Sequence, residues 1–369
     1  MIVQFLFQEI FVNFFIIILS VYIITKINIF QNVKTLQALF IYFYHSLFMI
    51  IMIFYNFKNP GDSNFIWRSV DDYNFDLFIS NGFMKFILFF FKHIIHLSYS
   101  NLILLVNLIG TIGILFFFDF LKNNLSDKKI VLIFSIILLP SLHLWTNTYI
   151  KDSFILTLLF IFFWAESQKK NYNNLQIFLL ILIFAIRPYL GILFLFPFII
   201  KIYLNSSNKI LLTLPLILFS ILISVFLLIF LRHHTLDISS FNPFETISYI
   251  LSRFDSIQHG SSFIDTDKFF LVNMISYLFS PIFYPFLSIN PINVILICES
   301  ILLTFIFFYL FKNYENNFNL IKFLYFLSLL LLLFIVSDTT TNIGIVLRQK
   351  WTILIFFIYI LVDGQKKKL

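Results

Sequence analysis

Long apolar segments follow one another along almost the whole chain. Many of them approach the roughly 20 residues that an α-helix needs to cross the hydrocarbon core of a bilayer. The chain is 60% hydrophobic and only 12% charged, which excludes a soluble globular domain. Because backbone polar groups in lipid must be satisfied internally, we expect an all-α fold, a polytopic transmembrane helical bundle. The expected apolar segments are 5–25, 36–56, 98–120, 130–142, 154–166, 175–187, 189–204, 210–231, 270–289, 293–311, 319–336 and 351–362.

Basic residues are distributed unevenly among the loops between these segments. One set of short loops is rich in lysine and ends with Lys366 to Lys368, whereas the alternate loops are acidic. Under the positive-inside rule, the lysine-rich loops face the cytoplasm. The acidic loops are then periplasmic, a loop plus an interfacial helix at 57–97 and a loop at 232–269. The net charge of +7 comes from the loop lysines, so we expect no nucleic-acid partner.

Two apolar stretches have features that argue against a membrane span. In 79–97, Lys85, Lys92 and His96 fall on one side of a helical wheel, which predicts an interfacial amphipathic helix. In 270–289, two prolines four residues apart favour a re-entrant or surface-lying segment. The topology then has about 11 spans, with a range of roughly 10 to 12, in one integral membrane domain that covers 1–369.

A few charged residues interrupt the apolar segments at positions that a bilayer normally excludes. Such a charge costs several kcal/mol unless it is paired, hydrated or in contact with a ligand. In the expected topology these residues open to the periplasmic side, where arginine forks and lysine point charges suit a pyrophosphate headgroup. A nearby carboxylate could deprotonate an attacking hydroxyl. The candidate catalytic residues are Asp62 and Asp152, and the candidate substrate-binding residues are Lys151, Arg187, Tyr189, Arg348, Arg68 and Arg232.

Structural roles compete with these functional ones. Arg187, which precedes a proline, could anchor a helix end at a membrane interface, and Arg348 could be an ordinary flanking charge. Lys151 and Asp152 could form an internal ion pair, or Asp152 could cap the next helix. Glu299 is expected to bond within the bundle. The chain has a single cysteine, and its adjacent histidines at 233 and 234 lack a third partner at ligand spacing, so we expect no metal or other cofactor.

Several short motifs follow one another over most of the chain. They are Gly61-Asp62-Ser63, 107–113, Leu139-Pro140-Ser141 through Trp145 to Lys151-Asp152-Ser153, Arg187-Pro188-Tyr189, Gly260-Ser261-Ser262, Cys298-Glu299-Ser300, and Asn342-Ile343-Gly344 leading to Arg348-Gln349-Lys350. Their order resembles that of bacterial O-antigen and capsule repeat-unit polymerases, the Wzy family, and of polytopic GT-C-like glycosyltransferases. The outer loop at 232–268 is modest for this family, and Arg232 and Arg253 are its only arginines.

This resemblance implies a polymerase of the bacterial inner membrane. Its substrate would be an undecaprenyl-pyrophosphate-linked oligosaccharide held in the lipid bilayer, and a chain-length regulator protein would be a partner. Arg187, Arg348 and Lys151 would hold the pyrophosphate around one cavity open to the periplasm, with Asp62 at its rim. Three alternatives stay open. A flippase or transporter of lipid-linked sugars would need the same cations but no base, and a GT-C glycosyltransferase would use a polyprenyl-phosphate sugar donor. A non-catalytic assembly subunit would leave the stranded charges unexplained.

Overall fold

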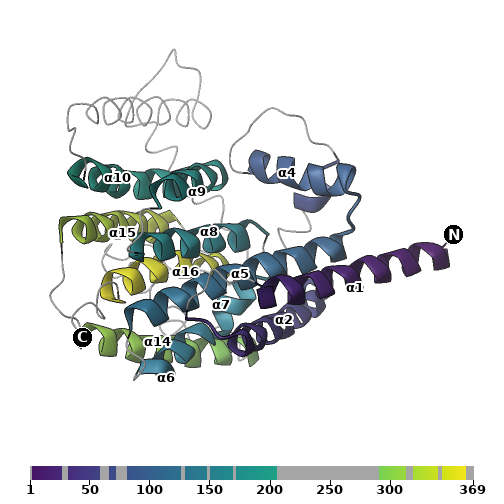
Figure 1. The fold of residues 1–369 in the computed structure, drawn as a ribbon, viewed down its shortest axis with the longest axis horizontal. Coiled ribbons are helices and arrows are strands. Elements are labelled where there is room, and N and C mark those ends of the chain that lie inside the picture. Colours follow the sequence, from purple (N-terminus) through teal and green to yellow (C-terminus); the bar gives the residue numbers. More distant parts are fainter. Residues whose placement is uncertain are drawn as a thin grey trace, which may run out of the picture. The chain divides into compact units, whose positions relative to one another are not determined.

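The computed structural model of the chain is helical throughout the residues that it describes, as the apolar segments predict (Figure 1). Those residues are 2–26, 32–58, 66–71, 81–125, 129–147, 150–168, 172–205, 291–312, 319–339 and 343–362. The expected segments 210–231 and 270–289 lie outside them. The helices are α1 (Ile2–Lys26), α2 (Thr35–Lys58), α4 (Asn81–Phe89), the π-helix η1 (Phe90–Ile94), α5 (Tyr99–Asn124), α6 (Ile130–Ile137), α7 (Pro140–Trp145), α8 (Ile150–Ser167), α9 (Asn173–Ile186), α10 (Pro188–Asn205), α14 (Pro291–Lys312), α15 (Leu320–Thr339) and α16 (Ile343–Val362).

Three helical stretches of the described part are long and apolar enough to cross a membrane. They are Glu9–Lys26 in α1, Thr35–Phe54 in α2 and Tyr99–Asn124 in α5. Their length and composition indicate a membrane protein. Other apolar helices, such as Asn173–Ile186 and Leu320–Leu333, are shorter. The total of about 11 spans stays a prediction.

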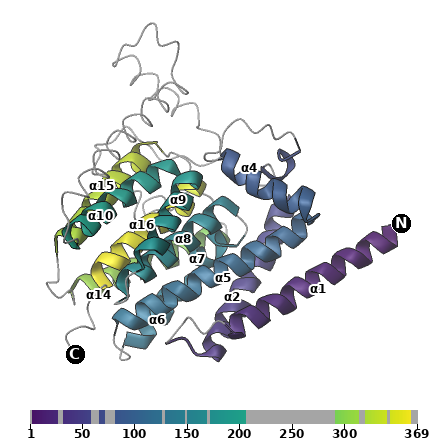
Figure 2. The same ribbon diagram turned by 45° about the horizontal axis from the view of Figure 1, so that its top comes forward.

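The chain divides into two compact units. One contains residues 1–191, 290–317 and 354–369, and the other contains 192–289 and 318–353. In the first unit, α5 packs against α1, α2 and α8, and α14 packs against α6 and α7 (Figure 2). In the second unit, the rings of Phe194 and Tyr325 join α10 to α15, with their centroids 6.5 Å apart.

The contact between α5 and α8 combines aromatic stacking with a close backbone approach. Phe117 stacks on Phe160 at 4.6 Å between ring centroids. Towards the start of α5, Gly113 faces Thr157, where an added Cβ would lie 2.7 Å from the threonine Oγ1 and 2.8 Å from its Cα. The Thr157 hydroxyl donates to the carbonyl of Ile109 (3.2 Å). The missing side chain at Gly113 therefore lets α8 pack directly on the α5 backbone.

Polar side chains fix both ends of α5. At its start, the Ser98 hydroxyl accepts a hydrogen bond from the Asn101 amide, and the Asn101 side chain accepts one from the Ser98 amide, which forms a capping box. Asn101 also donates to Asn13 of α1 (2.7 Å). Near its end, Asp119 accepts from the Trp164 indole of α8 (2.8 Å) and from the Asn32 amide (3.2 Å). These contacts connect α5 to its neighbours at both ends.

The predicted segment 130–142 is two helices, so its treatment as one run is wrong. α6 ends at Ile137 and α7 begins at Pro140. Proline has no amide hydrogen to continue a helix, and it favours an extended backbone in the residue before it. Leu139 accordingly has φ −60° and ψ 123°. The chain therefore turns inside an apolar region instead of passing straight through it.

The predicted amphipathic helix at 79–97 exists but is shorter and less regular than expected. It runs as α4 to Phe89 and continues as the π-helix η1 to Ile94. His96 has a left-handed backbone with φ 58°, so it is not on the helical face that the wheel assigned to it. Amides of Ile95 and Leu97 donate to Phe90 and Phe91, which closes the widened turn. Membrane contact of this helix stays a prediction.

Replacement of Gly113 by alanine tests the close approach of α5 and α8. In an open helical position, Gly→Ala stabilises a protein by about 0.5–1 kcal/mol. At Gly113 the new methyl group would meet the backbone and hydroxyl of Thr157. We expect Gly113→Ala to lower the free energy of unfolding by about 1–3 kcal/mol, measured by denaturant unfolding in detergent. A stabilised variant would show that α8 does not pack on this glycine.

Candidate functional site

The turn between α9 and α10 is built around Arg187. Its backbone is non-helical, with φ −138° and ψ 89°, as expected for a residue that precedes a proline. Its amide donates to the Ile183 carbonyl (2.7 Å), which completes α9. Its own carbonyl accepts from the amides of Leu190 (3.0 Å) and Gly191 (3.2 Å) in the first turn of α10. Arg187 therefore ends one helix and starts the next.

Gly191 makes this turn compact. A Cβ on Gly191 would lie 2.6 Å from the Cα of Phe184 in α9. The first turn of α10 thus packs directly on the last turns of α9. Backbone hydrogen bonds and the close packing of the two helices hold the Arg187 backbone, so its Cα and Cβ have defined positions.

The Arg187 side chain forms a buried ion pair with Asp152. Arg187 Nη2 donates to Asp152 Oδ1, although the two residues are 35 positions apart. Their side chains are only 11% and 9% exposed. Arg187 Nη1 also lies 3.5 Å from the Tyr189 hydroxyl. Three of the sequence-predicted site residues therefore meet where the start of α8 reaches the α9–α10 turn.

Lys151 adds a second positive charge to this group. It is next to Asp152 in the first turn of α8 and close enough to Arg187 for the two cations to repel each other. Asp152 lies inside the first turn and bonds to Arg187, so it is not the residue that caps α8 from outside. The group formed by Lys151, Asp152, Arg187 and Tyr189, hereafter the Arg187 cluster, has one positive charge in excess. Such a group at the start of a long helix favours anions.

The structure does not place the other predicted site residues, Asp62, Arg68, Arg232 and Arg348, in this cluster. Asp62 and Arg232 lie outside the described residues. Arg348 is on α16, but its side chain is also outside the described part, and it belongs to the second compact unit. That Arg348 shares a cavity with Arg187 and Lys151 stays a prediction. The proximity of Lys151 and Arg187 is observed.

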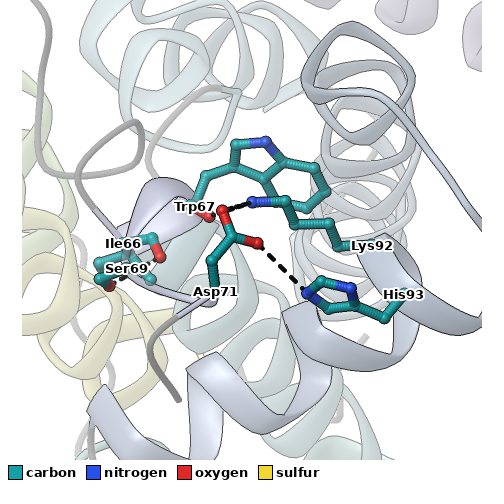
Figure 3. Close-up of polar contacts among 6 residues, drawn as sticks. All are labelled: Ile66, Trp67, Ser69, Asp71, Lys92 and His93. Atoms are coloured by element: carbon teal, nitrogen blue, oxygen red, sulfur yellow. Dashed lines mark hydrogen bonds and ion pairs between the residues drawn. The ribbon is translucent and has the colours of Figure 1, made fainter.

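Arg68 is exposed and lies in the short segment 66–71. Trp67 and Asp71 of this segment contact Lys92 and His93 of η1 (Figure 3). Lys92 Nζ donates to Asp71 Oδ2 (2.7 Å) and to the Trp67 carbonyl (3.3 Å), and it lies 5.1 Å from the centre of the Trp67 ring. His93 Nε2 is 3.3 Å from the other Asp71 oxygen. The Lys92 hydrogen bond, reinforced by the charge of Lys92 and by His93, holds the pKa of the Asp71 carboxyl below its ordinary value.

An apolar pocket of about 720 Å³ lies between α6 and α14. Its walls include Phe134, Leu138, Ile295 and Leu302, with Cys298 and Glu299 on the α14 side. Glu299 accepts hydrogen bonds from the amide of Ser141 (2.8 Å) and from its hydroxyl, so it bonds within the bundle as expected. The dimensions and lining suit a hydrocarbon chain, with a carboxylate at one edge.

Sequence reasoning missed one polar pair in the first unit. His45 of α2 and His143 of α7 are fully buried, with their Nδ1 atoms 3.0 Å apart. In the sequence, His45 stands out as a polar residue inside an apolar span. Nothing in the sequence indicates that His143 is its partner. Among the described residues, no group of three or more His, Cys, Asp or Glu side chains could hold a metal ion.

Comparisons with protein-family models, with curated proteins and with solved structures give no match to this chain. The functional interpretation therefore depends on the residues and on their geometry.

A double-mutant cycle tests the buried ion pair. Arg187→Met leaves a buried carboxylate, and Asp152→Leu leaves a buried guanidinium, so each should cost about 3–5 kcal/mol of unfolding free energy. The double variant removes both charges and should cost clearly less than the sum of the two. Unfolding in lipid nanodiscs gives the four free energies. Additive losses would mean that the two side chains do not interact.

The contact of the segment 66–71 with η1 should depend on pH. Because the pKa of Asp71 is lower in the folded protein than in the unfolded chain, the carboxylate stabilises this contact at neutral pH. This stabilisation by the Asp71 carboxylate is lost as the pH falls through the pKa that Asp71 has in the folded protein. We expect Asp71→Asn to accelerate hydrogen exchange of the 66–71 amides at neutral pH, with Lys85→Gln on α4 as the matched control. Equal acceleration by both variants would contradict a specific role for Asp71.

Proposed function

We propose that the protein polymerises lipid-linked oligosaccharide repeat units at the periplasmic face of a bacterial inner membrane. The observation that carries the proposal is the Arg187 cluster, in which the ion pair of Arg187 with Asp152 lies close to the charge of Lys151 at the start of α8. A buried charge group of this kind in an apolar protein is a functional candidate by default. The order of the short motifs along the chain supports the choice of reaction.

The cluster suits a pyrophosphate because it combines a planar guanidinium with a lysine. Arg187 can present parallel N–H donors to phosphate oxygens, and Lys151 adds a point charge. Asp152 accepts a hydrogen bond from the guanidinium and orients it. In this proposal Asp152 is therefore a positioning residue, and Asp62 accepts the proton. Tyr189 and the first turn of α8 complete the anion-binding surface.

The reaction is a glycosyl transfer. A hydroxyl of the acceptor sugar attacks the anomeric carbon of the donor glycan, and the bond from that carbon to the pyrophosphate oxygen breaks. The hydroxyl proton passes to the base, and undecaprenyl pyrophosphate leaves with the negative charge that Arg187 and Lys151 stabilise. The apolar lining of the pocket between α6 and α14 supports the proposal, because it suits a hydrocarbon chain. The growing glycan is thus transferred as a block while the lipid tails stay in the bilayer.

The test uses cells in which variants replace the protein, with the chain length of the surface polysaccharide as the measurement. Arg187→Ala should reduce long-chain polymer by about 100-fold or more while the protein stays in the membrane. Arg187→Lys should rescue poorly because lysine lacks the bidentate fork. Lys85→Gln on α4 is the matched loss of a positive charge outside the cluster and should leave chain length unchanged.

Two outcomes would overturn the proposal. Polymer of normal length and amount from Arg187→Ala would make Arg187 a structural anchor. Purified protein in vesicles that moves a lipid-linked repeat unit across the membrane without lengthening it would indicate a flippase.

A further inference from the structure

The π-helix η1 and the segment 66–71 lie at one end of the span that α5 forms. Four residues separate Ile94, the last residue of η1, from Tyr99, where α5 begins. Such a linker reaches at most about 18 Å, because an extended residue spans about 3.3–3.6 Å. The ring of Trp67 lies 6.1 Å from the ring of Tyr99. Tryptophan and tyrosine are enriched where hydrocarbon meets headgroups, so this pair places both segments at the membrane boundary.

The apolar side chains of α4 and of η1 have different surroundings. Met84 and Leu88 of α4 are fully buried, and α4 packs against α9. None of the five residues of η1 is buried. Phe90, Ile94 and the next residue, Ile95, are 47%, 59% and 46% exposed. The apolar side of α4 therefore packs inside the protein, whereas the widened turn after it presents large apolar side chains outward.

Outward apolar side chains at this position favour contact with lipid. They lie beside the end of a span, where the upper acyl region of the bilayer is within reach. Apolar side chains of an interfacial helix become buried about 5–10 Å into the boundary between headgroups and acyl chains. That burial removes their apolar surface from water, which is favourable. The exposed side chains of Phe90, Ile94 and Ile95 therefore fit the bilayer surface.

Charged side chains lie next to this apolar turn. Arg68 is exposed, and among the described residues it forms no ion pair. Lys92 Nζ donates to Asp71 (2.7 Å), and His93 lies 3.3 Å from the same carboxylate (Figure 3). With histidine neutral, Arg68, Lys92 and Asp71 together carry one positive charge in excess. A basic group at a membrane surface attracts anionic lipid headgroups.

We propose that Arg68, Phe90, Lys92, Ile94 and Ile95, hereafter the η1 surface, bind anionic phospholipid in the leaflet at the start of α5. The three apolar side chains enter the bilayer just below the headgroups. The Arg68 guanidinium holds a lipid phosphate through paired N–H donors, and Lys92 adds its charge while it stays bonded to the protein. No covalent bond forms or breaks. This binding is independent of the polymerase reaction, so either proposal can fail alone.

Depth-resolved quenching tests the membrane contact. Cys298→Ser removes the single native thiol, and Ile94→Cys then carries one fluorophore in lipid nanodiscs. We expect a lipid nitroxide near the headgroup to quench this fluorophore more strongly than a nitroxide at the end of the acyl chain. Ile18→Cys is the matched control, because Ile18 is 51% exposed in the middle of the span Glu9–Lys26. A fluorophore there should prefer the deeper nitroxide.

Lipid preference tests the headgroup contact. At about pH 8, where an ordinary histidine is neutral, spin-labelled phosphatidylglycerol should quench the fluorophore at residue 94 more than spin-labelled phosphatidylcholine. Arg68→Gln should lower this preference by about three- to fivefold, which is the factor for one basic residue near an anionic surface. Lys34→Gln should leave it unchanged. Lys34 is exposed near the opposite end of α5, since neighbouring Asn32 bonds to Asp119.

Three results overturn the proposal. A fluorophore at residue 94 that only a water-soluble quencher reaches would place the turn in water. A fluorophore that no quencher reaches would mean that a protein partner covers the turn. Equal quenching by the two lipids would remove the preference for an anionic headgroup. All three are measured with Arg68 in place, and Ile95→Cys repeats them at a second exposed position, so one variant that fails to fold does not decide the outcome.

Discussion

A polar group inside an apolar bundle costs free energy unless it has a partner, and several of the described contacts follow from this constraint. Arg187 has its counter-charge on another helix, and the carbonyls at the α6–α7 break are satisfied by Tyr44 and His143 of α2 and α7. Glu299 is held by Ser141 in the same way. Three of these pairs join residues that are far apart in the sequence, whereas His143 and Ile137 are only six residues apart. Polar residues therefore specify which helices are neighbours, while the apolar majority supplies the burial.

The helices were largely predictable from the sequence because their apolar runs are visible in the hydropathy. Segments such as 98–120 and 319–336 correspond to α5 and α15 within a few residues. The break at Pro140 was also visible in principle, since proline cannot continue a helix. The left-handed backbone of His96 was not visible, because it depends on how the widened turn of η1 closes. A helical wheel assumes one uniform period and cannot represent that turn.

The candidate site was predictable as a set of residues but not as a set of contacts. Charges stranded in apolar surroundings single out Arg187 and Asp152, because isolated charges there are costly. Which charge pairs with which depends on the packing of α8 against α9, and hydropathy does not encode it. The partner of His45 was hidden for the same reason. The ion pair also changes the role expected of Asp152, since its carboxylate is bound to the Arg187 guanidinium and orients it.

The π-helical turn at 90–94 affects how this region tolerates changes in length. A π-turn holds one residue more than the α-helical turn that it replaces, and it arises as a local insertion in a helix. Here Lys92 and His93, adjacent in sequence, both reach Asp71. Deletion of one residue from this turn would restore a regular α-helix and rotate α4 by about 100° relative to the start of α5. A substitution in η1 alters one side chain, whereas a single deletion would turn the entire apolar face of α4 away from its present neighbours.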